Sequence, residues 1–198
     1  MLSSNKCKVQ VYTEIKSISF AALQRLKLLE ENIRSENILC SIVDLSTIAS
    51  IFHLEVGVVH AIKHTSAKNR KTKSFYDEVM YFLSTSNKIN DAYEQFKVGI
   101  NTKSFAIIEI VESDNITSHD YSNSVFQANL QSFLVDMEAN PDINAQYIAT
   151  ESYFAAPLSE EKYKHIMKLN KLTQPEIDCC IGLDNAIATR IATKEFIN

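Results

Sequence analysis

The stretch FAIIEIV, from Phe105 to Val111, is the clearest strand in this chain of 198 residues. It is apolar except for one glutamate, a pattern typical of a buried strand. Upstream, Val9–Ile15 alternates apolar and polar residues, which predicts a first strand, and the short apolar run Ile38–Val43 predicts a second, buried one. The run Glu78–Leu83 is interpreted as a further strand. Together these segments predict a small β-sheet.

Apolar residues at helical spacing lie between and after these strands. Ser19 can cap a helix whose inward face carries Ala22, Leu26, Leu29 and Ile33. The fold class is therefore mixed α/β (α+β): one domain, residues 1–198, in which helices cover a small sheet and a long helix ends the chain. The other predicted helices rest on these positions: Ile48, Ile51, Phe52, Val59 and Ile62; Asn87–Phe96; Val125, Leu130 and Leu134; a short helix opened by Ser159; and one within Thr173–Phe196, the last and longest.

Composition limits the possible functions. Lys and Arg number 20 and Asp and Glu 24, a net charge of -4, so any contact with nucleic acid must rest on a local basic patch. The three glycines are too scattered for a phosphate-cradling loop, which excludes a P-loop or a Rossmann turn. The N-terminus lacks an apolar signal region and no stretch is long enough to span a bilayer, so we expect a cytoplasmic and nuclear protein. The four cysteines show no zinc-ligand spacing and are expected to be free thiols.

One segment, Val56–Tyr76, contains no Asp or Glu at all. A loop of this kind can neutralise several phosphates while the rest of the protein stays acidic. Phe75 and Tyr76 follow it at once and could offer a ring for an unpaired base to stack on. The alternative is a solvated surface loop. The cations in and beside the loop are Lys63, Lys68, Arg70, Lys71 and Lys73.

The predicted last helix carries two adjacent apolar stripes. One holds Ile177, Cys180, Ile181, Ala188 and Ile191, and the other holds Cys179, Leu183, Ala186 and Ile187. Together they cover roughly 200 degrees of the helix, about twice the stripe that a surface helix needs. One stripe can pack on the sheet, and the other then needs a cover from this chain or from another protein. The second stripe continues into two cations, Arg190 and Lys194.

Two enzymatic alternatives stay open. His60 and His64 have the four-residue spacing that lets two imidazoles reach one metal ion, although Ala61 stands where a catalytic zinc helix carries Glu. Cys179 lies about one turn from the predicted start of the last helix, where a thiol could be activated, although no partner histidine is evident. The alternative for the histidine pair is that both are ordinary surface residues. The alternative for the cysteine is a small residue of the core.

Two groups of motifs lie in the middle and at the end of the chain. The first group is Lys71-Thr72-Lys73, Glu78, Leu83-Ser84, Asn87, Ile89, Ala92, Phe96 and Val98, and the second is Lys171-Leu172, Ala186-Ile187, Arg190 and Thr193-Lys194. In order and spacing these motifs resemble those of TPRKB-type proteins, the smallest core subunit of the KEOPS (EKC) complex, although Thr85 stands where the family usually has Pro, and Lys97 where it has Gly.

This resemblance implies a non-catalytic adaptor without a cofactor. Members of the family bind the N-terminal lobe of a small atypical kinase-like ATPase and hold tRNA, notably its 3′ CCA end. They support threonylcarbamoylation of tRNA by a different, catalytic subunit. The kinase-binding residues would then be Cys179, Leu183, Ala186, Ile187 and Arg190. The tRNA-binding residues would be Lys68, Arg70, Lys71, Lys73, Arg190 and Lys194. An interaction module without an RNA role is the remaining alternative.

Overall fold

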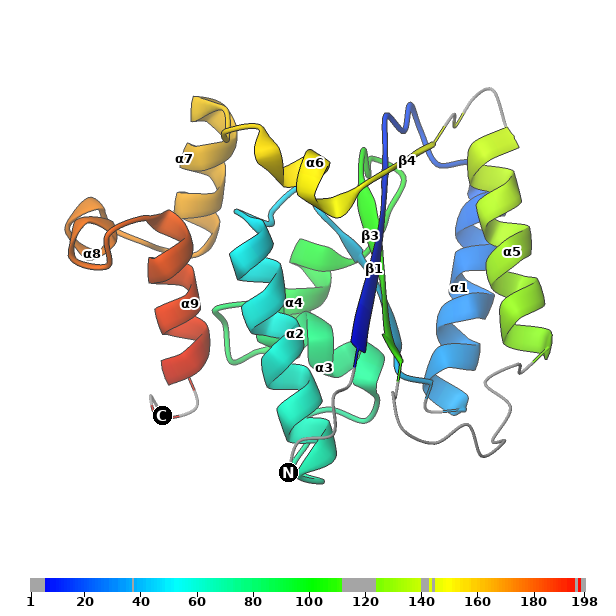
Figure 1. Cartoon of the computed structure of the whole chain (residues 1–198), viewed down its shortest axis with the longest axis horizontal. Helices are drawn as coiled ribbons and strands as arrows, with labels where there is room; N and C mark the ends of the chain where they lie inside the picture. The colour runs from blue at the N-terminus through cyan, green and yellow to red at the C-terminus, as the bar shows by residue number, and fades with distance from the viewer. Residues whose placement is uncertain are drawn as a thin grey trace.

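A four-stranded antiparallel sheet, in the order β2-β3-β1-β4, forms the centre of the computed structural model (Figure 1). The structure describes residues 6–36, 38–111, 124–139, 143, 145–194 and 196. β3 pairs with β1 on one side and with β2 on the other, which confirms the FAIIEIV stretch as a central strand. The strands are β1 (Lys6–Thr13), β2 (Cys40–Asp44), β3 (Phe105–Val111) and β4 (Gln146–Ile148).

Helices cover both faces of this sheet. In Figure 1, α1 (Phe20–Ser35) and α5 (Ser124–Ala139) lie on one side. The helices α2, α3 and α4 lie on the other side, and α7, α8 and α9 extend beyond α2. The mixed α/β class is therefore confirmed. The remaining bounds are α2 (Ile51–Ser66), α3 (Phe75–Leu83), α4 (Ile89–Phe96), α6 (Thr150–Ala155), α7 (Glu160–Leu169), α8 (Gln174–Cys179) and α9 (Leu183–Thr193).

Serine side chains determine where several helices begin. The Oγ of Ser19 accepts the N–H of Ala22 at 3.2 Å, which confirms the predicted cap of α1. Each such cap satisfies a backbone donor that the helix leaves unpaired, and removing one costs about 1 kcal/mol. The same arrangement opens α2, α3 and α7, where the caps are Ser50, Ser74 and Ser159.

The prediction of a strand over Glu78–Leu83 is wrong, because this segment belongs to helix α3. Every residue of α3 is buried, so the helix shows no polar face that would reveal a helical period. A short, continuously apolar run cannot be assigned to strand or helix by periodicity alone. α3 packs closely on α2 at Gly57, where an added Cβ would lie 2.6 Å from Leu83 Cδ2.

The predicted long C-terminal helix is interrupted and forms α8 and α9. Ile181 and Gly182 adopt positive φ angles of 59° and 132°, which no α-helix accommodates. The N–H of Gly182 bonds to the carbonyl of Ile177 at 3.0 Å, the bond that closes a Schellman motif. With 11 residues, α9 is also shorter than the 16-residue α1 and α2, so it is not the longest helix.

The predicted apolar face of the second helix is partly wrong. Phe52 and Val59 are 40% and 59% exposed. The buried positions of α2 are instead His53, Leu54, Gly57, Val58, Ala61 and His64. The buried face of α2 thus includes two histidines, and a search for apolar residues at helical spacing does not count histidine as a core residue.

Between Pro141 and Pro157 the chain forms β4 and α6. Within the part of the chain that the structure describes, no helix has the length and apolar character needed to cross a membrane.

Candidate functional site

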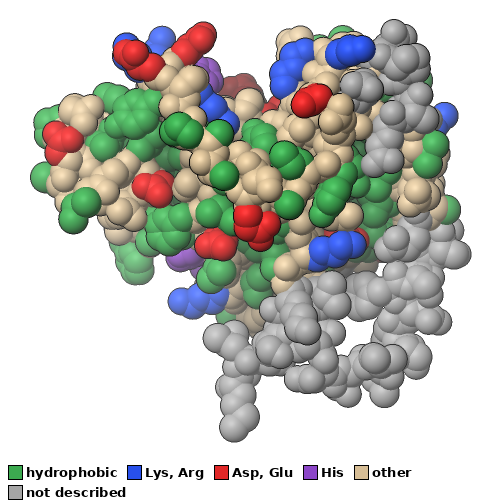
Figure 2. Space-filling model, turned by 45° about the horizontal axis from the view of Figure 1, so that its top comes forward, with side chains coloured by type: hydrophobic (Ala, Val, Ile, Leu, Met, Phe, Trp, Pro, Cys, Tyr) green, Lys and Arg blue, Asp and Glu red, His purple; other side chains and the backbone are tan. Residues whose placement is uncertain are grey.

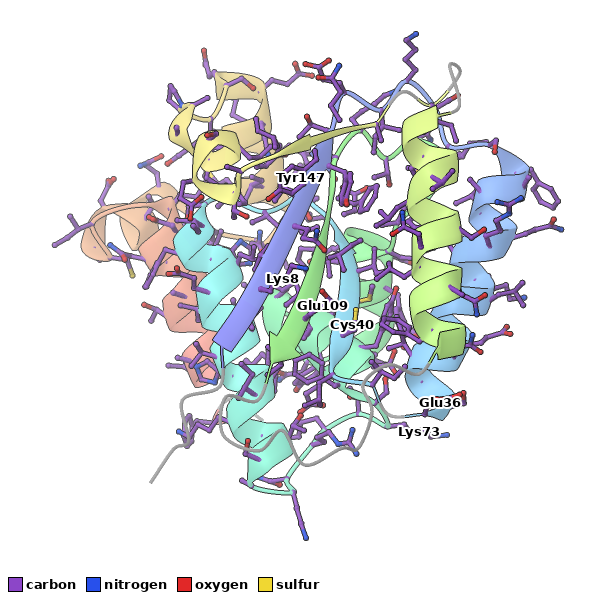
Figure 3. The ribbon with its side chains drawn as sticks, turned by 45° about the vertical axis from the view of Figure 1, so that its right-hand side comes forward. Lys8, Glu36, Cys40, Lys73, Glu109 and Tyr147 are labelled. Atoms are coloured by element: carbon purple, nitrogen blue, oxygen red, sulfur yellow. The ribbon has the colours of Figure 1, made fainter. Side chains whose placement is uncertain are left out.

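The basic loop, residues 67–73, connects α2 to α3 and carries four of the predicted tRNA-binding cations. Lys68, Lys71 and Lys73 are exposed and Arg70 is half-buried. The loop begins at the end of α2, where Lys68 takes a positive φ of 52° and the N–H of Asn69 bonds to the carbonyl of His64 at 2.9 Å. In Figure 3, Lys73 lies at the lower end of the molecule. The structure therefore brings these four cations together on one short loop.

A single buried carboxylate holds the middle of this loop. Glu78 is fully buried in α3, and its Oε2 accepts the N–H of Lys71 at 3.1 Å, the N–H of Thr72 at 2.9 Å and the hydroxyl of Thr72 at 2.6 Å. Its Oε1 also accepts the N–H of Lys71, at 3.0 Å. Glu78 was recognised in the sequence only as a motif position, and its role in the loop follows from these bonds.

The expected stacking platform is absent from the basic loop. Phe75 and Tyr76 are 1% and 0% exposed, because both belong to the buried helix α3. The Tyr76 hydroxyl donates to Glu30 at 2.7 Å, and burial raises the pKa of Tyr76 well above its ordinary value. Neither ring is available to a base, so the loop offers charge rather than stacking.

An ion-pair network anchors α3 to α1 beside the loop. Arg34 Nε donates to Asp77 at 3.0 Å, and Tyr93 donates to the same carboxylate oxygen at 2.5 Å. Burial alone would lower the pKa of Arg34, but the hydrogen bond and charge of Asp77 raise it overall. Burial and the bond to Asp77 raise the pKa of Tyr93 to about 12. The network therefore keeps Arg34 charged at neutral pH and fixes the helix from which Glu78 projects.

Three of the four residues of the second stripe are buried, contrary to the expectation of a free docking face. Leu183 is 6% exposed, and Ala186 and Ile187 are completely buried where α9 packs against α2. This chain itself covers the stripe. Direct contact between these three side chains and a partner would require α9 to separate from α2.

The two cations at the far end of that stripe are engaged within the chain. Arg190 pairs with Glu176 through Nε at 2.6 Å and Nη2 at 2.7 Å, and the hydrogen bond from Arg190 lowers the pKa of Glu176. Lys194 is 3% exposed, and its Nζ donates to the carbonyls of Tyr81 and Ser84. The expected role of Lys194 as a surface phosphate contact is therefore wrong in this structure, and Arg190 links α9 to α8.

What α8 and α9 do expose is the turn between them. Ile181 is 87% exposed, Cys179 is exposed and Cys180 is half-buried. Hydrophobic side chains reach the surface around this end of the molecule, at the left of Figure 2. Ile181 also occupies the left-handed φ region, which strains a β-branched residue. The structure thus exposes Ile181 of the first predicted stripe and Cys179 of the second, both at this turn.

The residues of the enzymatic alternatives serve other contacts. The His60 ring stacks on Phe82 with a centroid distance of 5.4 Å, and the His64 ring is tilted against the same side chain at 4.6 Å. Nδ1 of His64 donates to the carbonyl of Asn69 at 3.0 Å. Across the described residues, no group of three or more His, Cys, Asp and Glu side chains could hold a metal ion. Cys179 is the last residue of α8 and does not lie at a helix N-terminus. All four cysteines, each of them described, are free thiols.

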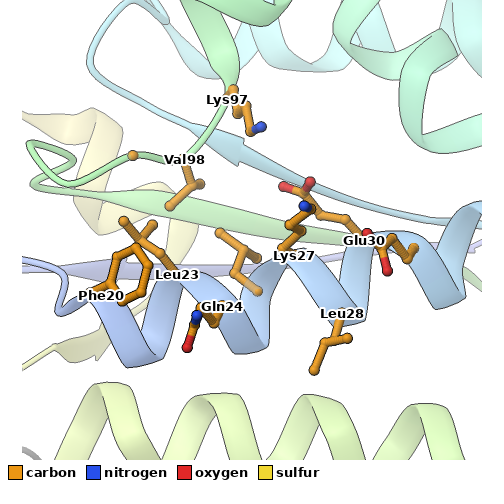
Figure 4. Close-up of a pocket in the computed structure, with 11 residues that line it drawn as sticks. Phe20, Leu23, Gln24, Lys27, Leu28, Glu30, Lys97 and Val98 are labelled. Carbon is orange, nitrogen blue, oxygen red and sulfur yellow. The ribbon is translucent and has the colours of Figure 1, made fainter.

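A groove of about 840 Å³ lies on the opposite side of the sheet, over α1 (Figure 4). Its apolar lining includes Phe20, which is 73% exposed, and Val98, and its rim carries Lys27, Lys97 and Glu31. No pattern in the sequence predicts this groove. Its mixed charges favour no particular ligand.

Comparison with known proteins agrees with the resemblance found in the sequence. Residues 20–195 match the family model described as kinase binding protein CGI-121. A segment of 119 residues, 60% of this chain, is 25% identical to the EKC/KEOPS complex subunit CGI121 of Coccidioides immitis (strain RS). The matched segment spans 55% of that relative's length.

Proposed function

This chain belongs to the family of kinase-binding protein CGI-121, and we propose that it is a non-catalytic subunit of a KEOPS (EKC) complex. In this proposal it binds the small atypical kinase-like ATPase of the complex and also tRNA, including the 3′ CCA end. It supports threonylcarbamoylation of tRNA by the catalytic subunit, and carries out no chemistry itself. The family match over residues 20–195 is the observation that supports the proposed binding to a kinase.

The α8–α9 turn is the surface that best suits the kinase. An exposed, strained apolar side chain is costly to maintain, and such outliers cluster where a partner is bound. Ile181 combines 87% exposure with a φ of 59°. Leu183 and Ile187, which follow the turn in α9, are buried, and the pair between Arg190 and Glu176 fixes α8 against α9. Ile181 and Cys179 would then make the contacts that the buried Leu183, Ala186 and Ile187 cannot make.

The basic loop is the surface that best suits tRNA. Lys68, Arg70, Lys71 and Lys73 concentrate positive charge in a chain whose net charge is -4. Contacts of this type bind phosphates regardless of sequence and weaken as salt rises. Because Phe75 and Tyr76 are buried, the loop would grip the backbone of tRNA rather than its bases.

Calorimetric titration against the small KEOPS kinase of the same organism tests the first part of the proposal. We expect a one-to-one complex, and no heat with two folded proteins would refute kinase binding. Fluorescence anisotropy with labelled tRNA tests the second part. We expect binding that weakens with salt and that falls when the CCA end is removed. Equal affinity for intact and trimmed tRNA would refute recognition of the CCA end.

A further inference from the structure

The carboxylate of Glu78 is fully buried and directed at the basic loop. It accepts the N–H groups of Lys71 and Thr72 and the hydroxyl of Thr72, at distances from 2.6 to 3.1 Å. A buried carboxylate is destabilising unless hydrogen bonds replace its water. The loop supplies those bonds, and in return its backbone at Lys71 and Thr72 is held in one conformation.

The two ends of the loop are fixed as well. At the start, His64 donates to the carbonyl of Asn69 at 3.0 Å and accepts the N–H of the same residue through its own carbonyl at 2.9 Å. At the end, Ser74 caps α3 and donates to Asp77 at 2.8 Å. The backbone that carries the lysines is therefore held at its beginning, middle and end.

This arrangement has a consequence for binding a polyanion. The N–H groups of Lys71 and Thr72 point at Glu78 and not at solvent, so phosphate contacts fall to the side chains. A loop that is already ordered loses less conformational entropy when it binds. The side chains of Lys71 and Lys73 are exposed on this ordered backbone.

We propose that Glu78 is a positioning residue for RNA binding: it sets the conformation of the basic loop without touching the ligand. The inference rests on the proposed binding of tRNA by this loop. It makes a prediction opposite to that of simple electrostatics. Removing a negative charge next to a basic loop should tighten binding to a polyanion if charge alone matters, whereas loss of the clamp should weaken it.

The test replaces Glu78 by Gln, which keeps the shape but removes the charge and turns one of the two accepting oxygens into an NH2 donor. We expect affinity for fluorescently labelled tRNA to fall roughly fivefold or more, because the loop must be ordered on binding. The slope of log affinity against log salt should be unchanged, because every cation is still present. Amide hydrogen exchange at Lys71 and Thr72 should become faster.

A milder pair of variants guards against a general loss of folding. Thr72→Val removes the hydroxyl that bonds to Glu78 and keeps the shape, whereas Thr72→Ser keeps the hydroxyl. We expect a partial loss of affinity in the first and wild-type affinity in the second. Wild-type or tighter binding by both Glu78→Gln and Thr72→Val would overturn the positioning role alone. Failure of the wild-type protein to bind tRNA would overturn the proposed function and this inference with it.

Discussion

At the scale of single residues, Ile181 offers a test in which stability and binding move in opposite directions. Its φ of 59° suits glycine, so Ile181→Gly should keep or raise the free energy of unfolding, by about 1 kcal/mol. The same change removes the exposed side chain and should weaken kinase binding at least tenfold, as measured by calorimetry. Arginines at the buried Leu183 and Ile187 would instead disturb the packing of α9.

The matched control for Ile181 is Val59→Gly or Val59→Asp, since Val59 is also an exposed β-branched residue but lies on α2. The aspartate change should leave kinase binding intact, and the glycine change should cost stability because Val59 is inside a helix. Wild-type kinase affinity in both Ile181→Gly and Ile181→Asp would place the kinase surface elsewhere.

His53 makes the stability of the protein depend on pH. It is fully buried, Nδ1 accepts the N–H of Ala49 at 3.2 Å, and Nε2 donates to the carbonyl of Leu83 at 2.8 Å. Burial lowers the pKa of His53 to about 4. Between pH 4 and 6.5 the unfolded chain binds the proton more readily, so acidification through this window should lower the free energy of unfolding, by about 3 kcal/mol in all.

Urea unfolding at several pH values measures this loss, and NMR titration of the imidazole measures the pKa of His53 directly. His53→Gln should be less stable at neutral pH but should lose this part of the pH dependence. Replacement of the exposed His165 by Gln serves as the comparison. Titration of His53 near 6.5 would contradict its buried, neutral state.

At the scale of elements, the basic loop should contribute to RNA affinity through charge. Lys71→Glu with Lys73→Glu should weaken tRNA binding and flatten its dependence on salt, because each lost phosphate contact removes about 0.7–0.9 from the slope of log affinity against log salt. Lys164→Glu with Lys168→Glu makes the same change in net charge on the exposed face of α7. An equal effect of both pairs would mean that net charge, and not the loop, governs binding.

Elements were predictable where their local signals were complete. The strand at Phe105–Val111 has a continuous apolar run, and α1 has both a serine cap and a clear periodic face. α3 was missed because its burial on all sides removes the periodicity that separates helix from strand. The break before α9 was missed because it places an isoleucine, rather than a glycine, in the left-handed position.

The same reasoning explains how much of the candidate site the sequence could show. The exposure of lysines in an acid-free segment can be predicted from the sequence, because charged side chains are rarely buried. Which of two apolar stripes packs inward depends on the neighbouring helix, and α2 covers Leu183 and Ile187. The clamp by Glu78 depends on hydrogen bonds between a helix and a loop, for which sequence spacing gives no geometry.

At the scale of the whole molecule, the proposed kinase and tRNA surfaces belong to different parts of the fold. The α8–α9 turn lies beyond α2 on the far side from α1 and α5, while the basic loop follows the end of α2 (Figure 1). Substitutions at sites without shared partners usually have additive effects on free energy. In the proposed function, a kinase and tRNA would therefore bind at the same time without competing for a side chain.

Lys194 is one of the residues that join the C-terminal helices to the rest of the molecule. Its Nζ lies 3.6 Å from the ring centroid of Tyr81 and donates to two carbonyls at the end of α3, those of Tyr81 and Ser84. Lys194→Met keeps the apolar stem but removes the ammonium group that donates to these two carbonyls, so the free energy of unfolding should fall by about 2–3 kcal/mol. Because Lys194 is 3% exposed, tRNA affinity of the folded variant should be unchanged.

Chemical denaturation measures the free energy of unfolding, and fluorescence anisotropy measures tRNA affinity. Lys168→Met, a change at an exposed lysine, should alter neither. A stable Lys194→Met protein with weakened tRNA binding would instead return Lys194 to the surface and assign it to phosphate.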